Sequence, residues 1–223
     1  NNDDKMILIK NGIEASKILV LPYGLTTERY DQLTRVSGNL PEKNEIAFVG
    51  TFDLRKGAKE FPKIIRLISK EIPSVRFKLL GTSAMFPTKE AIYKYFPKNL
   101  HSFIEVVPKF DPKDLPELLM NSKLGIFPSH MESFGFGVLE MMAAGLPVVA
   151  YNVPGPNELL PSSLLVERND YHHMAKKIIQ LLKSESEYVQ MAQTVKDRAS
   201  KFNWHDVALE TSKIYLENID QRK

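Results

Sequence analysis

The amino-acid sequence predicts an α/β fold in which helices cover both faces of a doubly wound parallel sheet. Short apolar runs that fit buried strands alternate with helical segments along the chain, which is the pattern of a parallel sheet. Glycine or proline follows four of these runs, at Gly50, Gly81, Pro108 and Pro128. Because such sheets bind ligands at the carboxyl ends of their strands, the loops after these residues are expected to converge on one crevice.

The predicted elements begin after an irregular N-terminal segment. Residues 1–6 are polar and are expected to be disordered. KILVLPYGL, at 17–25, is typical of a short strand that ends in a Pro-Tyr-Gly turn, and residues 26–44 fit a linker. The chain begins with Asn-Asn-Asp-Asp rather than with Met, so we expect a fragment or a processed product.

From residue 45 onward, strands and helices are predicted in alternation. Apolar runs predict strands at 45–50, 75–81, 103–107, 124–127 and 146–151, and a small edge strand at 164–166. Helical spacing predicts helices at 58–71, 88–97, 170–183 and 185–200. Asp111 and Pro112 are typical of a further helix start. The last helix follows Asn203 and carries an apolar stripe headed by Trp204.

The stretch from Pro128 to Pro154 holds the residues that point to a ligand. Gly135 and Gly137 are predicted at the start of a helix, where glycine lets a ligand approach the backbone and the unpaired first amides suit a phosphate. Glu140 is the one charge in an otherwise apolar helix. A buried carboxylate needs a partner, and none is close in the sequence.

Helix geometry relates Glu140 and Glu132 to such a ligand. Glu140 lies roughly 7 Å along the helix from Gly135, at about 1.5 Å per residue, so a diphosphate at the helix start would leave its ribose near Glu140. Glu132, in the preceding loop, would meet whatever the diphosphate carries at its other end. Each acid taken alone also fits a plainer interpretation, as a surface residue of the helix or an ordinary loop acid.

The same stretch resembles the signature of the retaining GT-B glycosyltransferases of family 4, the glycosyl transferases group 1. That signature combines Pro-Ser, two Glu residues with seven positions between them, Phe-Gly after the first Glu, and Ala-x-Gly-x-Pro-Val. Its positions are filled here by Pro128, Ser129, Glu132, Phe134, Gly135, Glu140, Ala143, Gly145, Pro147 and Val148. Ser133 departs from the pattern, which usually has Gly. The resemblance covers almost the whole chain and implies a Rossmann-like sheet that forms the C-terminal half of a GT-B fold.

The resemblance implies a nucleoside diphosphate sugar, UDP- or GDP-linked, as the ligand, and no cofactor. Glu132 and Lys56 are implied as catalytic residues, with Glu132 on the donor sugar and Lys56 on the diphosphate. Glu140 would hold the ribose hydroxyls. The other implied donor-binding residues are Gly50, Thr51, Arg55, Gly81, Lys109, Phe110, Phe134, Gly135, Phe136, Gly137 and Val138.

Two parts of this implied site leave alternatives open. The family usually has Arg where this chain has Thr51, so the second phosphate-binding cation is in doubt, and Arg55 is the candidate to replace it. The backbone of residues 108–110 matches the segment that faces the nucleobase, and an ordinary loop between a strand and a helix fits it equally.

Composition narrows the other classes of function. The net charge is +3, with Lys and Arg spread along the chain, so nucleic-acid binding is not expected. The chain has no cysteine, which removes disulfides and thiolate metal sites and fits a reducing compartment. Its histidines form no cluster and it has no Asp-x-Asp motif, so no metal site is expected. No apolar run approaches ~18 residues, so no transmembrane segment is expected.

The resemblance also implies three parts for the chain. Residues 1–44 would be a linker from an N-terminal acceptor-binding domain that is missing here, 45–200 the nucleotide-sugar-binding domain, and 201–223 a crossover helix. Without that partner domain, the stripe of Trp204 is expected to be partly exposed or to cover another surface. The parent enzyme would be cytoplasmic, and peripheral association with the inner face of the membrane is left open.

The implied activity is transfer of a hexose-type sugar to a hydroxyl acceptor, a glycan or lipid-linked glycan, in polysaccharide biosynthesis. The transfer would be metal-independent, and this chain alone would be inactive without the acceptor domain. Two alternatives remain beside it. One is a nucleotide-sugar epimerase of GT-B architecture, and the other is a catalytically silent nucleotide-binding module.

Overall fold

The computed structural model describes residues 1–35 and 43–220 and contains a six-stranded sheet in the order β3-β2-β1-β4-β5-β6. Every neighbouring pair of strands is parallel. The strands are β1 (Glu45–Val49), β2 (Arg76–Leu80), β3 (Ile104–Val107), β4 (Ser122–Phe127), β5 (Val148–Tyr151) and β6 (Leu165–Val166). The predicted Rossmann-like fold is confirmed, and the strand order reverses direction between β1 and β4, which makes this the topological switch point.

The central strand β1 is buried at all five positions, because helices cover both faces of the sheet. Ile46 lies between Phe77 on β2 and Leu124 on β4. A strand that is buried on both faces has a continuous apolar sequence rather than an alternating one. This is why β1 could be predicted from the sequence.

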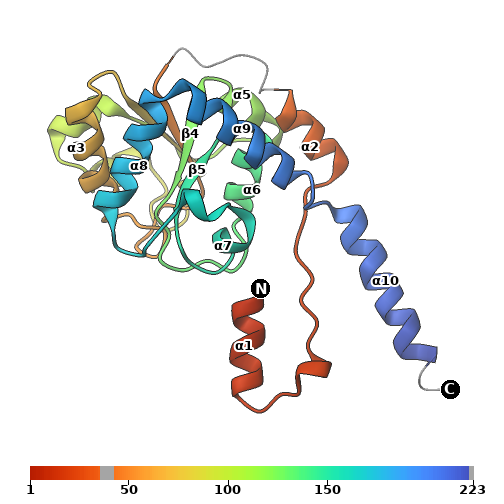
Figure 1. Cartoon of the computed structure of the whole chain (residues 1–223). Helices are drawn as coiled ribbons and strands as arrows, with labels where there is room; N and C mark the ends of the chain where they lie inside the picture. The colour runs from red at the N-terminus through yellow and green to blue at the C-terminus, as the bar shows by residue number, and fades with distance from the viewer. Residues whose placement is uncertain (36–42, 221–223) are drawn as a thin grey trace.

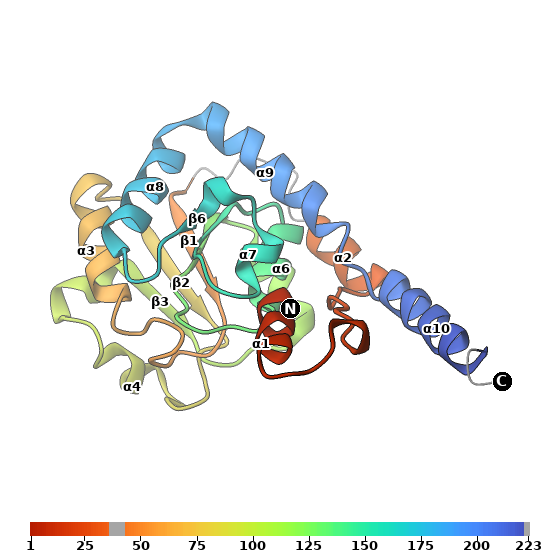
Figure 2. The same ribbon diagram turned by 60° about the horizontal axis from the view of Figure 1, so that its bottom comes forward.

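Two layers of helices enclose this sheet (Figures 1 and 2). α3 (Phe61–Glu71) and α8 (Tyr171–Lys183) pack together on one face, and α6 (Phe136–Ala143) packs on the other, against β1, β4 and β5. α2 (Thr27–Thr34) and α5 (Leu115–Leu119) lie beside each other on the α6 side, and α9 (Glu185–Ala199) crosses from α8 to α6. The shorter elements are α4 (Lys89–Tyr93), α7 (Pro156–Leu159), η1 (Ala15–Lys17), η2 (Lys98–Phe103), η3 (Pro112–Asp114) and η4 (Ser162–Leu164).

The apolar stripe of α3 confirms the predicted helix but not its first residue. Phe61, Ile64, Ile65 and Ile68 are all fully buried. The helix begins at Phe61 rather than at residue 58, because the preceding residues form a turn around Asp53. In that turn the amide of Ala58 donates to the carbonyl of Asp53 at 3.1 Å.

The structure contradicts the expectations for the first part of the chain. Residues 1–6, expected to be disordered, belong to a helix, α1 (Asn2–Lys10), whose start is capped by the Asn1 side chain. The amide of Asn2 also donates to Oε1 of Glu158 at 2.7 Å, which attaches this helix to the sheet domain. The Asn1 cap is a local contact, but the contact with Glu158 joins residues that are 156 positions apart and has no local sequence signal.

Residues 17–25 and the segment after them also differ from the expectation. No strand forms in 17–25; its one ladder contact is an isolated bridge between Leu25 and Asn203. The expected linker at 26–44 contains α2, which starts with Thr26 as its cap and buries Leu33 completely. Residues 36–42 of that linker lie outside the described part of the chain.

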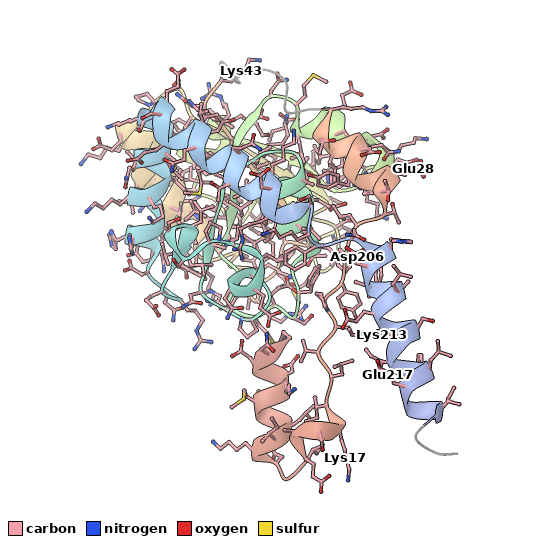
Figure 3. The ribbon with its side chains drawn as sticks, turned by 45° about the vertical axis from the view of Figure 1, so that its right-hand side comes forward. Lys17, Glu28, Lys43, Asp206, Lys213 and Glu217 are labelled. Atoms are coloured by element: carbon pink, nitrogen blue, oxygen red, sulfur yellow. The ribbon has the colours of Figure 1, made fainter. Side chains whose placement is uncertain are left out.

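The last helix, α10 (Trp204–Asp220), begins where it was predicted and leaves the sheet domain. Figure 3 shows Asp206, Lys213 and Glu217 spaced along it away from the strands. Trp204 is 38% exposed and Tyr215 is 68% exposed, so the expected partial exposure of the stripe is confirmed. Among the described residues, no helix has the length and apolar character that crossing a membrane requires.

Candidate functional site

A cavity of about 430 Å³ opens at the switch point, where β1 and β4 end. Eight of the predicted site residues line it. They come from two segments of the chain. The loop after β1 contributes Gly50, Thr51 and Lys56, and the segment that leads into α6 contributes Glu132, Phe134, Gly135, Phe136 and Gly137. Tyr23 from the N-terminal segment adds a further wall. The convergence expected at this sheet edge therefore brings the loops after β1 and β4 together.

Direct contacts hold these two loops together. The amide of His130 donates to the carbonyl of Arg55 at 2.7 Å, and the buried hydroxyl of Ser129 donates to the same carbonyl at 3.3 Å. At Gly57 a Cβ atom would lie 2.2 Å from the carbonyl oxygen of Pro128, so only glycine allows this approach. The backbone thus fixes the position of Lys56 relative to Glu132.

Lys56 and Glu132 form an ion pair across the cavity wall. Their side chains are 18% and 15% exposed, so both are largely withdrawn from water. The ammonium of Lys56 also lies 5.3 Å from the centre of the Phe127 ring, within the range of a cation–π contact. The cation and the acid that the resemblance pairs with a donor are therefore immediate neighbours.

Asp53 organises the loop that carries Lys56. Its Oδ1 accepts from the amides of Arg55 at 2.8 Å and Lys56 at 3.1 Å, and its Oδ2 accepts from the guanidinium of Arg55 at 3.3 Å. Burial alone would raise the pKa of Asp53, but the hydrogen bonds from Lys56 and Arg55 outweigh it and hold the pKa below its ordinary value. The ionised carboxylate therefore stabilises this turn.

Replacing Asp53 is expected to destabilise the fold through those two amides. Asp53→Ala leaves the amide of Arg55 without its acceptor, while the amide of Lys56 keeps its bond to the carbonyl of residue 53 at 3.1 Å. The substitution should lower the free energy of unfolding by about 1–3 kcal/mol at pH 7. Asp53→Asn keeps one oxygen acceptor and should cost less. Urea denaturation measures both, with the exposed Asp114→Asn as the matched control. Equal losses for the Ala and Asn variants would contradict this account of the turn.

The pKa of Asp53 also gives the expected pH dependence. Because the pKa is lower in the folded than in the unfolded chain, the stabilisation is complete above the unfolded value. It is lost as the pH falls through the folded value. The difference in unfolding free energy between the wild type and Asp53→Asn should therefore shrink below about pH 3.9. A difference that grew on acidification would have the wrong sign.

The start of α6 shows that its two glycines serve different purposes. Gly135 precedes the helix with φ of 95°, a left-handed conformation that favours glycine. Gly137 has no positive φ, but a Cβ there would lie 2.2 Å from the carbonyl oxygen of Val49. Gly137 was expected to give a ligand access to the backbone, and the structure shows that its missing side chain lets α6 pack against the end of β1.

The amides at the start of α6 remain oriented toward the cavity end of the helix. The first backbone bond of the helical type runs from the amide of Leu139 to the carbonyl of Gly135, at 3.0 Å. The amides of Phe136, Gly137 and Val138 precede that bond, as the first amides of any helix do. Val138 itself is fully buried behind them. The helix start therefore presents backbone donors and the positive end of its dipole at the cavity.

Glu140 has a partner that no local pattern indicated. Its Oε1 accepts from Arg29 on α2, from Nη2 at 2.7 Å and from Nε at 3.1 Å. The two side chains are 16% and 20% exposed. Glu140 is therefore a partly buried acid in an ion pair, and part of its side chain still touches solvent.

The remaining predicted residues lie at the same edge of the sheet but outside the lining of this cavity. Arg55 directs its largely exposed guanidinium to Asp53. Gly81 follows β2 with φ of 73°, and a Cβ on it would lie 3.3 Å from the Phe110 ring. Lys109 is exposed. Glu140 and Val138 are likewise outside this lining. The roles predicted for all of the site residues stay predictions.

Three further residues shape the site and are absent from the predicted set. Asp53 has a sequence signal, since an Asp two and three positions before amides that need an acceptor is typical of a turn. Arg29 and Tyr23 have none, because both reach the site from the N-terminal segment. The Tyr23 ring lies 5.4 Å from that of Phe134 and 5.6 Å from that of Trp204. Over residues 1–35 and 43–220, no three His, Asp or Glu side chains are grouped to hold a metal ion.

Solved structures with the same fold include glycosyltransferases. The Anabaena protein HepE, in complex with UDP and glucose, matches 96% of this chain and 60% of its own with a TM-score of 0.79 at 18% identity. The C-terminal domain of a glycosyl transferase group 1 family protein from Francisella tularensis matches 80% of this chain and 94% of its own, with a TM-score of 0.63 at 22% identity. At these identities the likeness establishes the fold.

Curated relatives and a family model give the membership. A D-inositol 3-phosphate glycosyltransferase from Paenarthrobacter aurescens is 25% identical over 93% of this chain and 53% of its own length. An uncharacterised glycosyltransferase from Methanocaldococcus jannaschii is 26% identical over 98% of this chain and 61% of its own. The chain thus spans little more than half of these relatives. The family model for glycosyl transferases group 1 matches residues 31–198, and the chain belongs to that family.

Proposed function

We propose that this chain is the donor-binding domain of a retaining, family 4 glycosyltransferase that uses a UDP- or GDP-linked sugar. The observation that carries the proposal is the cavity at the switch point, which is lined by Lys56, Glu132 and the start of α6. Parallel sheets bind ligands at this place, and helix starts bind phosphates. The complex of HepE with UDP and glucose supports the same class of ligand here.

In this proposal the diphosphate lies against the start of α6 and beside Lys56. Amides of residues 134–138 and the lysine cation supply hydrogen bonds and positive charge to its oxygens. Lys56 lies at the cavity wall, where it lines the cavity together with the start of α6. Glu132 contacts the donor sugar, and Glu140, further along α6, accepts from the ribose hydroxyls.

The chemical role of these groups is stabilisation of the leaving group. Negative charge builds on the diphosphate as the glycosidic bond breaks, and donors that are already in place offset it without reorganisation. In this scheme Lys56 and the start of α6 supply the positive charge that a metal ion would otherwise provide, so the proposed transfer is metal-independent. Glu132 orients the sugar and is not assigned as a nucleophile.

The rest of the enzyme is also part of the proposal. Residues 1–44 connect to an acceptor-binding domain, and α10 crosses back onto it, which accounts for the exposed Trp204 and Tyr215. The acceptor is a hydroxyl group of a glycan or lipid-linked glycan in polysaccharide biosynthesis, and the transferred sugar is a hexose. The parent enzyme acts in the cytoplasm or at the inner face of the membrane. Product analysis distinguishes this from an epimerase, which would release an altered nucleotide sugar rather than a glycoside.

Substitution of the two acids tests the proposal by calorimetric titration with UDP, GDP and ADP. Glu140→Ala removes a charged acceptor for the ribose and should weaken the best-binding nucleotide by about 10- to 100-fold, since such hydrogen bonds contribute about 1.5–3 kcal/mol. Glu132→Ala should leave the affinity for the nucleoside diphosphate within about threefold, because that ligand lacks the sugar. In the enzyme with its acceptor domain, Glu132→Ala should mainly impair transfer.

Glu117→Ala, an exposed acid on α5, is the matched control and should bind as the wild type does. Unchanged affinity in Glu140→Ala would remove the ribose assignment. A wild-type chain that binds none of the three nucleotides at millimolar concentration would contradict the proposed function itself.

A further inference from the structure

Arg29 is the residue that contacts Glu140 most directly. Nη2 and Nε of the guanidinium donate to the same carboxylate oxygen, Oε1, at 2.7 and 3.1 Å. Among the described residues, the structure assigns no hydrogen bond to the other oxygen, Oε2. One oxygen of this carboxylate is therefore engaged by the protein, and the side chain keeps 20% of its surface exposed.

Arg29 and the helix that carries it are held in place at three points. Its remaining terminal nitrogen, Nη1, donates to the carbonyl of Pro112 at 2.5 Å. The backbone amide of Arg29 donates to Oγ1 of Thr26 at 3.1 Å, which is the cap of α2. Leu33, one turn further along α2, is fully buried. Arg29 thus reaches Glu140 from a helix whose start and buried face are fixed.

The start of α2 is also joined to the start of α10. The amide of Leu25 donates to the carbonyl of Phe202 at 2.9 Å, and the amide of Trp204 donates to the carbonyl of Leu25 at 3.0 Å. Figure 3 shows Glu28 on the outer side of α2, while Arg29, the next residue, points inward to α6. The helix therefore offers one residue at the site and an exposed neighbour for comparison.

We propose that Arg29 is a positioning residue that orients Glu140 to accept hydrogen bonds from the ribose hydroxyls of the nucleotide through Oε2. This inference rests on the proposed function, because it assumes that the ligand carries a ribose. A free glutamate side chain loses rotamer freedom when it is ordered. Arg29 orders it before the ligand arrives, so less affinity is lost on binding. The planar guanidinium does this better than an ammonium group, which has no fixed fork.

The experiment separates positioning from a merely structural contact between α2 and α6. Calorimetry measures the dissociation constant of UDP, GDP or ADP, whichever binds most tightly, and of its 2′,3′-dideoxy analogue. The ratio of the two constants reports only the ribose hydroxyls. A loss that is purely structural would weaken both ligands alike and leave this ratio unchanged.

For the wild-type chain the ratio of the dideoxy to the ribose constant should be about 10 or more. In Arg29→Met the ratio should fall toward 1, with the dideoxy constant unchanged. Arg29→Lys should reduce the ratio at least threefold, because a lysine offers one nitrogen on a flexible stem instead of two nitrogens in a fixed planar fork. Glu28→Met, the matched control on the same helix, should keep the wild-type ratio.

Each outcome decides the matter. A wild-type ratio near 10 that persists in Arg29→Met overturns the role of Arg29 and leaves the proposed function intact. Equal weakening of both ligands assigns Arg29 to the fold alone and also overturns it. A wild type that binds none of the three nucleotides overturns the proposed function and this inference with it. If Arg29→Met does not fold by circular dichroism, an unchanged ratio in Arg29→Lys overturns the proposal.

Discussion

Gly137→Ala is expected to destabilise the chain and to weaken nucleotide binding at the same time. The new Cβ would lie 2.2 Å from the carbonyl oxygen and 3.1 Å from the carbonyl carbon of Val49. Neither atom belongs to a flexible side chain, so the start of α6 must move away from β1. Overpacking of this kind typically costs about 1–3 kcal/mol of unfolding free energy, which urea denaturation measures.

The same displacement separates the helix start from the loop after β1, and both line the cavity. Affinity for UDP or GDP should fall about tenfold or more, since losing a contact of about 1.4 kcal/mol has that effect. Gly12→Ala is the control, because Gly12 has a positive φ but no atom near its missing Cβ. It should leave nucleotide binding unchanged. A Gly137→Ala chain with wild-type stability and affinity would contradict the close packing.

Lys56→Ala is expected to have the largest effect on the reaction. In the proposed enzyme with its acceptor domain, it would remove the charged donor proposed for the leaving diphosphate, and we expect the transfer rate constant to fall by about 10²–10³. In the isolated chain, Lys56→Ala should weaken the binding affinity for UDP or GDP by about 10- to 100-fold, because hydrogen bonds to charged groups contribute about 1.5–3 kcal/mol. Uridine or guanosine, which lacks the diphosphate, should bind as before.

Lys59→Ala, an exposed lysine of the same segment, is the control and should leave both measurements unchanged. Lys56→Ala also leaves Glu132 without its ion-pair partner, so the double variant Lys56→Ala, Glu132→Ala separates this effect. If the double variant regains affinity for the diphosphate, the repulsion of an unpaired Glu132 explains part of the loss. An equal loss of binding affinity for the nucleoside and for its diphosphate in Lys56→Ala would contradict a role of Lys56 at the phosphates.

The sheet was predictable because its signals are local. The strands from β1 to β5 are rich in apolar residues and are followed by turn residues, and α3 repeats its buried isoleucines at helical spacing. The N-terminal segment was predicted wrongly, since α1 buries no residue and has only weak helical patterning. Its position depends instead on contacts of Asn1 and Asn2 with residues far along the chain.

The candidate site was predictable in part for a related reason. Lys56, Glu132 and Gly135 follow the ends of β1 and β4, and parallel strands bring their carboxyl ends to one edge. The cavity that these residues line is therefore a consequence of the strand order. Asp53 could have been found from its spacing to the two amides that donate hydrogen bonds to it, because such turns have a local sequence pattern.

The amino-acid sequence by itself determined the parallel sheet, the apolar helix α6 and the need of Glu140 for a partner. Only the tertiary structure identified that partner as Arg29, which is 111 positions away in sequence, and showed that Gly137 is required by the carbonyl of Val49. The spacing of apolar residues along a helix or strand, together with its amino-acid composition, encodes which face of that element is buried. They do not encode which distant polar group or backbone atom that face meets, because this depends on how the elements pack.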